Sequence, residues 1–178
     1  MNNYTDKNLL NAVGLSYGEL SLKGKNRGQF EKKLRNKINK VLKGFEYQLF
    51  DDLSKLYVFI NPENLDEITD KLKKVFGIVG LNQSAKVERN DEFIKEKVLE
   101  FANYAYEQGA RTFKIKVNRS NKGFEKKSMD YARELGAYVL VNSPFEKVKM
   151  KDPDVMINVD IRKNVYIYTD RIKTYGGL

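Results

Sequence analysis

"AVGLSYGELSLKGKNRGQFEKKLRNKINKVLKG", residues 12–44, changes from the apolar spacing of a strand to that of a helix. Val13, Leu15 and Tyr17 alternate with small residues, and this period of two predicts a strand over residues 12–17. A basic loop that contains glycines follows the strand. Beyond the loop, apolar side chains at helical spacing predict a helix that ends near Gly44: Phe30, Leu34, Ile38, Val41 and Leu42.

The pattern continues in a defined order through residue 87. Residues 45–50 and 55–60 have the character of strands, and the turn-prone "DDLS" between them predicts a hairpin. Residues 64–76 return to helical spacing, a glycine ends that helix, and residues 78–87 form a fourth predicted strand. The order β-α-β-β-α-β predicts a ferredoxin-like fold of the α/β (α+β) class, with both helices on one face of an antiparallel sheet.

A second set of elements follows in the remaining half of the chain. Residues 92–108 predict an amphipathic helix, and residues 112–119 predict a strand. A further helix is expected to begin at the capping residue Ser128 and to end at about residue 138. Three extended stretches complete this part, and the last two are expected to form a hairpin: residues 147–150, 155–161 and 165–169.

The composition excludes several classes of chemistry. The chain of 178 residues contains no cysteine and no histidine, so disulfides, thiolate nucleophiles, imidazole bases and the usual zinc ligands are absent. No apolar run approaches the roughly 20 residues that span a bilayer, and the N-terminus is polar. We therefore expect a soluble, cytoplasmic protein that has no membrane partner.

The positive charge is concentrated in two segments. The net charge is +9, whereas residues 21–40 carry +7 and residues 111–127 carry +6, which leaves −4 for the rest of the chain. Two cationic segments on an otherwise acidic chain indicate surfaces that bind a polyanion. The alternative is that each segment is only a solvated face of the fold.

The first basic segment does not match a nucleotide-binding loop. Five residues separate Gly18 from Gly24, where a Walker loop needs four, and Asn26 stands where its hydroxyl residue should be. The dinucleotide pattern G-x-G-x-x-G also fails. Asn26 and Gln29 resemble a helix capping pair, and a helix start retains affinity for phosphate. We therefore predict that this segment binds the backbone of a nucleic acid through Lys23, Lys25, Asn26 and Arg27.

The second basic segment places further candidate RNA-binding residues on a strand and on the loop that follows it. Phe124 lies among the basic residues, where its ring can stack on an unpaired base or can fold back as a core anchor. The candidates in this segment are Lys114, Lys116, Arg119, Ser120, Asn121, Lys122, Phe124, Lys126 and Lys127.

Two pairs of carboxylates are candidates for acid/base or metal sites. Asp51 lies beside Asp52, and Asp152 and Asp154 flank a proline. Aspartates in such turns most often accept hydrogen bonds from their own backbone. We therefore predict structural roles for them, and no catalytic, cofactor-binding or metal-binding residue in this chain.

Three stretches of the sequence resemble one family. "YGELSLKGKNRGQFEKKL" (17–34) closely resembles the N-terminal signature of tRNA 4-thiouridine synthetases, and "FKIKVNRSNKGFEKKSMDYARELGAYV" (113–139) and "KVKMKDPDVMINVDIRKNVYIYTDR" (147–171) resemble their THUMP domain. The resemblance implies a ferredoxin-like domain over residues 1–77 and a THUMP domain over residues 78–173 that binds the acceptor stem and 3′ end of tRNA. It also implies a catalytic domain that activates a uridine with ATP and receives sulfur from a persulfide carrier, and a link to thiamine biosynthesis.

The sequence departs from the family pattern in the parts that carry chemistry. It contains no SGG-x-D-S nucleotide loop and no cysteine to carry sulfur, and residues 174–178 resemble the start of a linker to a catalytic domain. We therefore expect the tRNA-binding part of a sulfurtransferase, non-catalytic alone, with ATP needed only by the catalytic domain. The alternatives are a THUMP-containing part of another tRNA-modifying enzyme, a general RNA-binding protein, and a small phosphotransferase that binds ATP.

Overall fold

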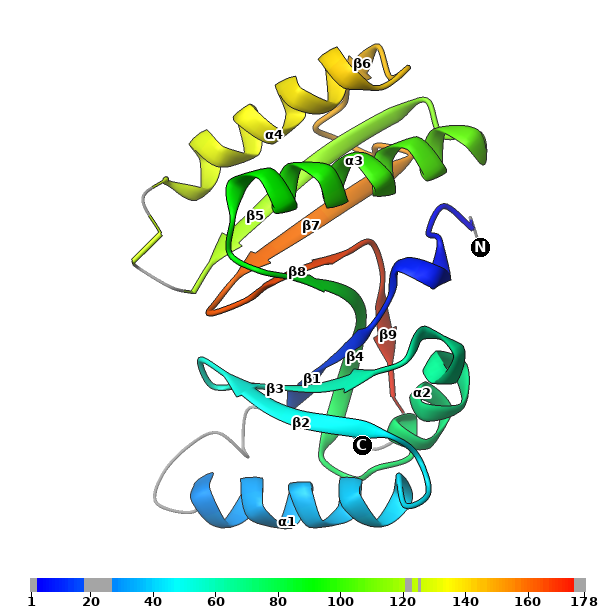
Figure 1. Ribbon diagram of the computed structural model, residues 1–178, viewed down its shortest axis with the longest axis vertical. Helices are drawn as coiled ribbons and strands as arrows, with labels where there is room; N and C mark the ends of the chain where they lie inside the picture. The colour runs from blue at the N-terminus through cyan, green and yellow to red at the C-terminus, as the bar shows by residue number, and fades with distance from the viewer. Residues whose placement is uncertain (1–2, 18–26, 121–122, 125, 175–178) are drawn as a thin grey trace. The chain divides into compact units, whose positions relative to one another are not determined.

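The computed structural model of the chain describes residues 3–17, 27–120, 123–124 and 126–174 (Figure 1). The chain divides into two units. The first unit consists of Asn11–Gln83 and Asp170–Leu178, and the second unit consists of Met1–Leu10 and Ser84–Thr169. Strand β4 (Ile78–Val87) crosses the boundary, so that its beginning belongs to the first unit and its end to the second.

The first unit has the predicted β-α-β-β-α-β order. The strand order is β2-β3-β1-β4, and β3 pairs antiparallel with both β1 and β2. The predicted hairpin is confirmed, since Leu53 and Ser54 form its turn with positive φ angles. The elements are β1 (Ala12–Tyr17), α1 (Arg27–Val41), β2 (Tyr47–Asp52), β3 (Lys55–Ile60), the 3-10 helix η3 (Pro62–Asn64), α2 (Leu65–Lys73), β4 and β9 (Arg171–Lys173).

The two helices of the first unit each bury an apolar stripe, and a glycine follows each of them. Their apolar stripes are buried and contribute to the core: Leu34, Ile38 and Leu42 from α1 and the residue after it, and Leu65, Ile68 and Leu72 from α2. Gly44 and Gly77 follow the two helices with φ angles of 97° and 103°, a conformation that favours glycine. The ferredoxin-like arrangement is thus set by the apolar periodicity and by these two stops.

The second unit contains a mixed sheet with two long helices. The strand order is β4-β8-β7-β5-β6, in which β5 runs parallel to β6 and β7, and β8 runs antiparallel to β7 and β4. Figure 1 shows α3 and α4 side by side over β5 and β7. The elements are the 3-10 helix η1 (Lys7–Leu9), α3 (Asp91–Glu107), β5 (Thr112–Arg119), α4 (Ser128–Asn142), β6 (Lys147–Val148), β7 (Val155–Ile161) and β8 (Val165–Tyr168).

The end points of α4 differ from the prediction. Ser128 is the first helical residue, and the cap position belongs to Lys127, whose side chain makes no capping hydrogen bond. The helix continues to Asn142, because Val139 extends its buried face and the first residue that breaks it is Pro144. A proline disfavours helical backbone at the residue before it, and Ser143 is accordingly extended.

Candidate nucleic-acid interface

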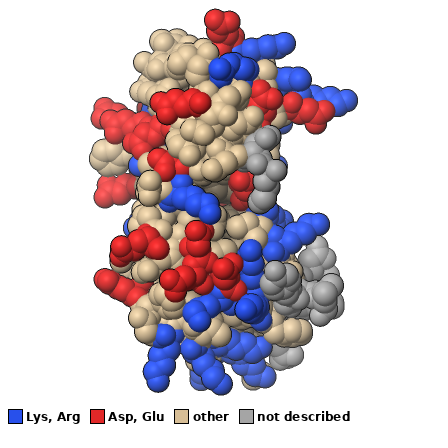
Figure 2. All heavy atoms as spheres, turned by 90° about the vertical axis from the view of Figure 1, so that its right-hand side faces the viewer, with Lys and Arg blue, Asp and Glu red and all other residues tan. Residues whose placement is uncertain are grey.

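Helix α1 presents a row of exposed lysines. Its apolar stripe is buried, its lysines are exposed, and Glu31 is its only acidic residue. Figure 2 shows Lys and Arg gathered at the lower end of the molecule, where Figure 1 places α1. Helix α1 and the two residues after it carry five exposed lysines, hereafter the α1 lysines: Lys32, Lys33, Lys37, Lys40 and Lys43.

Among the described residues, the α1 lysines have no carboxylate partner. Within the described ranges, the ammonium groups of Lys32, Lys33, Lys40 and Lys43 have no ion-pair partner. Like charges three and four residues apart on a helix destabilise it slightly. The α1 lysines therefore form a positive surface that no described neighbour neutralises.

An exposed aromatic ring lies beside this surface. Phe76 is 65% exposed, and the Lys37 ammonium lies 5.2 Å from the centre of its ring. Phe76 and the α1 lysines are not among the site residues predicted from the sequence. The helical spacing of Lys33, Lys37 and Lys40 is the signal that could have found the lysines.

The predicted phosphate-binding loop is mostly outside the described residues. Lys23, Lys25 and Asn26 lie there, so the predicted capping pair of Asn26 with Gln29 is described only at Gln29, within α1. Arg27 is the first residue of α1. The roles proposed for these four residues stay predictions.

In the second unit, the apolar and basic faces of β5 are separated as predicted. Phe113, Ile115 and Val117 are buried, whereas Lys116 is exposed and Lys114 is half-buried. The register with β7 places Lys114 beside Met156 and Lys116 beside Asn158. Ser120 and Lys127 are also exposed, and Asn121 and Lys122 lie outside the described residues.

Arg119 and Phe124, which were predicted to contact RNA, make contacts within the protein. Nη1 of Arg119 donates to the carbonyl oxygens of Phe124, at 3.1 Å, and Lys126, at 3.0 Å. The Phe124 ring lies edge-on to the Tyr131 ring of α4, with 5.2 Å between their centres. Phe124 therefore folds back onto α4 and is half-buried, which is the second of the two arrangements considered for it.

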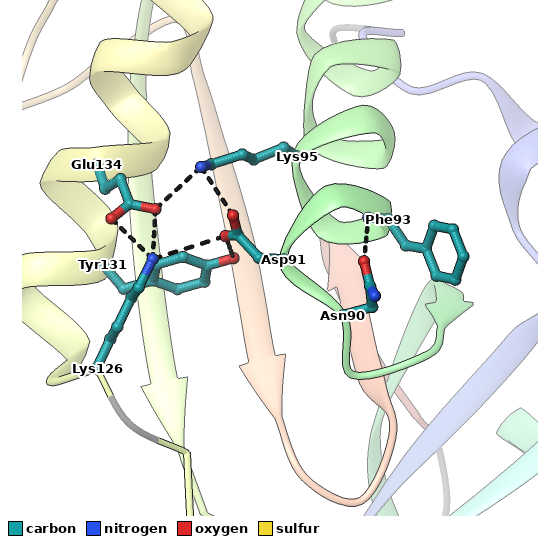
Figure 3. A network of polar contacts seen from close by, with 7 residues as sticks. All are labelled: Asn90, Asp91, Phe93, Lys95, Lys126, Tyr131 and Glu134. Carbon is teal, nitrogen blue, oxygen red and sulfur yellow. Dashed lines mark hydrogen bonds and ion pairs between the residues drawn. The ribbon is translucent and has the colours of Figure 1, made fainter.

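Lys126 belongs to a network of charged groups that Figure 3 shows. Its ammonium donates to both carboxylate oxygens of Glu134, at 2.9 and 2.7 Å, and lies 3.9 Å from Asp91 Oδ1. Lys95 Nζ bridges the same two carboxylates, at 2.8 Å from Asp91 and 3.1 Å from Glu134. The Tyr131 hydroxyl donates to Asp91 over 2.8 Å.

The network shifts the titration of its members. Hydrogen bonds from Lys126 hold the pKa of the Glu134 carboxyl below its usual value, and Lys95 adds to this effect. Partial burial opposes ionisation of Asp91, but hydrogen bonds from Lys95 and Tyr131 lower its pKa overall. The hydrogen bond to Asp91 raises the pKa of Lys95, so the two carboxylates and the Lys95 ammonium group stay charged at neutral pH.

Of the four paired aspartates, all predicted to be structural, Asp51 and Asp154 accept hydrogen bonds from backbone amides. Asp51 Oδ1 accepts a hydrogen bond from the Ser54 amide at 3.0 Å within the hairpin turn. Asp154 Oδ2 accepts from the Arg111 and Thr112 amides at 2.8 and 3.1 Å, and these bonds lower its pKa. Among the described residues, no group of three or more acidic side chains could hold a metal ion, and no helix is long and apolar enough to cross a membrane.

Family models match both halves of the chain. The ThiI ferredoxin-like domain matches residues 13–82, and the THUMP domain matches residues 88–170. A probable tRNA sulfurtransferase from Finegoldia magna is 40% identical over 169 residues, which are 93% of this chain and 43% of the relative. The corresponding protein from Clostridium acetobutylicum is 38% identical over 90% of this chain and 40% of the relative.

Solved structures with the same fold include PH1313 from Pyrococcus horikoshii Ot3, with a TM-score of 0.80 and 32% identity over 95% of this chain and 57% of that one. A 4-thiouridine synthetase in complex with RNA and bound ATP has a TM-score of 0.75 and 34% identity over 93% of this chain and 42% of that one. The chain thus spans about two fifths of the length of the curated relatives it matches. It belongs to the tRNA sulfurtransferase family and corresponds to its N-terminal part, with a ThiI ferredoxin-like domain followed by a THUMP domain.

Proposed function

We propose that this chain is the tRNA-binding part of a tRNA 4-thiouridine synthetase, which docks the acceptor stem and 3′ end of tRNA for a separate catalytic domain. The observation that carries the proposal is the similarity, over 93% of the chain, to a 4-thiouridine synthetase whose structure contains RNA. Membership of the tRNA sulfurtransferase family supports the same partner.

The unpaired cations support an electrostatic mode of binding. The α1 lysines in the first unit and Lys116 and Lys127 in the second are exposed and have no ion-pair partner among the described residues. Lysines that neutralise phosphates release condensed counterions, so each contact makes the affinity more dependent on salt. In this proposal these lysines bind the phosphate backbone and position the RNA, with little readout of base sequence.

Phe76 adds a different kind of contact to the first unit. Its exposed ring lies beside the Lys37 ammonium, a positive charge that attracts RNA. Aromatic rings in such surroundings stack on unpaired bases. We propose that Phe76 stacks on an unpaired nucleotide, a role that the half-buried Phe124 is less able to fill.

The thiolation chemistry belongs, in this proposal, to residues outside 1–178. The sequence contains no cysteine, so it offers no thiol to accept sulfur from a persulfide carrier. ATP would bind to the catalytic domain, and the complete enzyme would act in the cytoplasm. This chain supplies the docking of the tRNA.

A binding experiment with three RNAs tests the proposal. Intact tRNA, its isolated acceptor stem-loop, and a stem-loop without the unpaired 3′ nucleotides are titrated at several salt concentrations. We expect the first two to bind similarly, the third to bind more weakly, and every affinity to fall steeply with salt. Equal affinity for an unstructured single strand would favour a general RNA-binding protein, and calorimetric binding of ATP would favour a phosphotransferase.

A further inference from the structure

The peptide group between Lys126 and Lys127 is held from two sides. Its carbonyl oxygen, that of Lys126, accepts the 3.0 Å hydrogen bond from Arg119 at the end of β5. The side chain of Lys126 is fixed by its two hydrogen bonds to Glu134, one and a half turns into α4. The next side chain, that of Lys127, is exposed and has no ion-pair partner among the described residues.

The charges within the network of Figure 3 balance. Asp91 and Glu134 contribute two carboxylates, and Lys95 and Lys126 contribute two ammonium groups. Lys126 therefore adds no surplus positive charge to the surface of the second unit. A phosphate that recruited Lys126 would leave Glu134 with one cationic partner fewer.

We propose that Glu134, acting through Lys126, is a positioning residue for RNA binding: it fixes the backbone at Lys126 so that the unpaired Lys127 is presented to a phosphate. Lys95 of α3 pairs with Glu134, and Asp91 of the same helix pairs with Lys95. The inference rests on the proposed function for its ligand. It assigns Lys126 to the support of the interface and Lys127 to the contact.

The proposal and the simplest alternative predict opposite effects of one substitution. If Lys126 contacts phosphate directly, Glu134 competes for it, and Glu134→Gln adds one net positive charge and strengthens RNA binding. If Glu134 is a positioning residue, Glu134→Gln weakens the hold on Lys126 and RNA binding falls despite the more favourable charge. The direction of the change therefore decides between them.

Asp130→Asn is the matched control. Asp130 lies one turn earlier on α4, has Arg133, at 3.6 Å, as its only ion-pair partner in the described part of the chain, and its substitution changes the net charge by the same amount. We expect Glu134→Gln to weaken binding of intact tRNA about two- to fivefold, without a smaller salt dependence, and Asp130→Asn to bind at least as tightly as the unchanged chain. Unchanged or tighter binding by Glu134→Gln would overturn the proposal.

A second measurement needs no RNA. Amide hydrogen exchange, followed by NMR in the free protein, reports local opening at Tyr131, whose amide donates to the Lys127 carbonyl oxygen at 2.9 Å. We expect faster exchange there in Glu134→Gln and unchanged exchange in Asp130→Asn. Unaltered exchange in Glu134→Gln would overturn the positioning role even if tRNA binds well. If the unchanged chain binds no tRNA, the proposed function fails, and the exchange result still shows whether Glu134 holds this backbone.

Discussion

The two basic segments of the chain have similar net charge, but the fold uses their cations differently. The α1 lysines, which lie in or just after the first segment, have no ion-pair partner among the described residues, and the Lys37 ammonium lies 5.2 Å from the centre of the Phe76 ring. In residues 111–127, three of the six described cations bond to groups of their own unit: Arg111, Arg119 and Lys126.

The difference has a local cause. Helix α1 contains a single acidic residue, Glu31, whereas α3 and α4 mix acids and bases and bring Asp91 and Glu134 within reach of Lys126. The Arg111 guanidinium donates to the carbonyl oxygens of Tyr106 and Ala110 and lies 4.0 Å from the Tyr106 ring. The net charge of a sequence therefore overstates the charge that is available to a ligand. The difference between the two is larger in the second segment.

The strongest test of this comparison removes charge from α1. Replacing Lys33, Lys37 and Lys40 together by Gln is expected to lower tRNA affinity by about 10- to 100-fold and to reduce the magnitude of the salt slope by about two to three, because each lost phosphate contact contributes nearly one. The measurement is a titration of tRNA at several salt concentrations. Glutamine forms helices well, so α1 is expected to persist.

A control of equal charge is available in the same unit. Lys71, Lys73 and Lys74 lie on or beside α2, where acidic residues accompany them and Lys73 is 3.7 Å from Asp70. We expect their replacement by Gln to change tRNA affinity much less than the α1 triple. Equal losses in the two triple variants would mean that only total charge matters, and the distinction between the surfaces would be lost.

Most of the fold could be predicted, because burial imposes the periodicity that the sequence displays. Strand β9 was not predicted: it has only three residues, and its pairing with Gly80–Asn82 of β4 depends on tertiary contact. A Cβ on residue 80 would lie 2.7 Å from Arg171 Nε, so Gly80 leaves room for that side chain. A strand of three residues and this close fit leave no periodic pattern in the sequence.

The candidate site could be predicted less completely than the fold. Both cationic segments, and the side of β5 on which Lys114 and Lys116 lie, could be predicted from the sequence. The sequence could not show that Lys126 pairs with Glu134 and Asp91, since these residues come from three separate parts of the chain. Which cations remain unpaired is a property of the folded structure.

A smaller effect, on the free energy of unfolding, is expected to distinguish cations that stabilise the fold of the second segment from cations that face the ligand. Arg119→Ala is expected to lower the free energy of unfolding by about 1–2 kcal/mol, because two carbonyl oxygens lose a charged donor. Arg119→Lys should recover only part of this, since an ammonium group cannot reproduce the guanidinium fork. Urea unfolding measures both variants.

Lys116→Gln provides the contrast for Arg119. Lys116 is exposed and has no ion-pair partner among the described residues, so its loss should leave the free energy of unfolding within about 0.5 kcal/mol of the original value. Its loss should instead weaken RNA binding and reduce the salt slope by nearly one. Should Arg119→Ala alter the salt slope as Lys116→Gln does, while stability is unchanged, Arg119 would belong with the ligand-facing cations.

The smallest expected effect concerns pH and the network around Glu134. Hydrogen bonds from Lys126 lower the pKa of Glu134 in the folded chain, so the unfolded chain binds more protons as the pH falls below about 5. The stabilisation from this pair is therefore complete above the pKa of an unfolded glutamate and is lost as the pH falls through the lower folded value. Because the pair is partly exposed, we expect a few tenths of a kcal/mol. In urea unfolding between pH 7 and pH 3, the free energy of unfolding should decline less steeply in Glu134→Gln than in the unchanged chain. Parallel declines would mean that the ion pairs of Glu134 stabilise the second unit no more than solvent does.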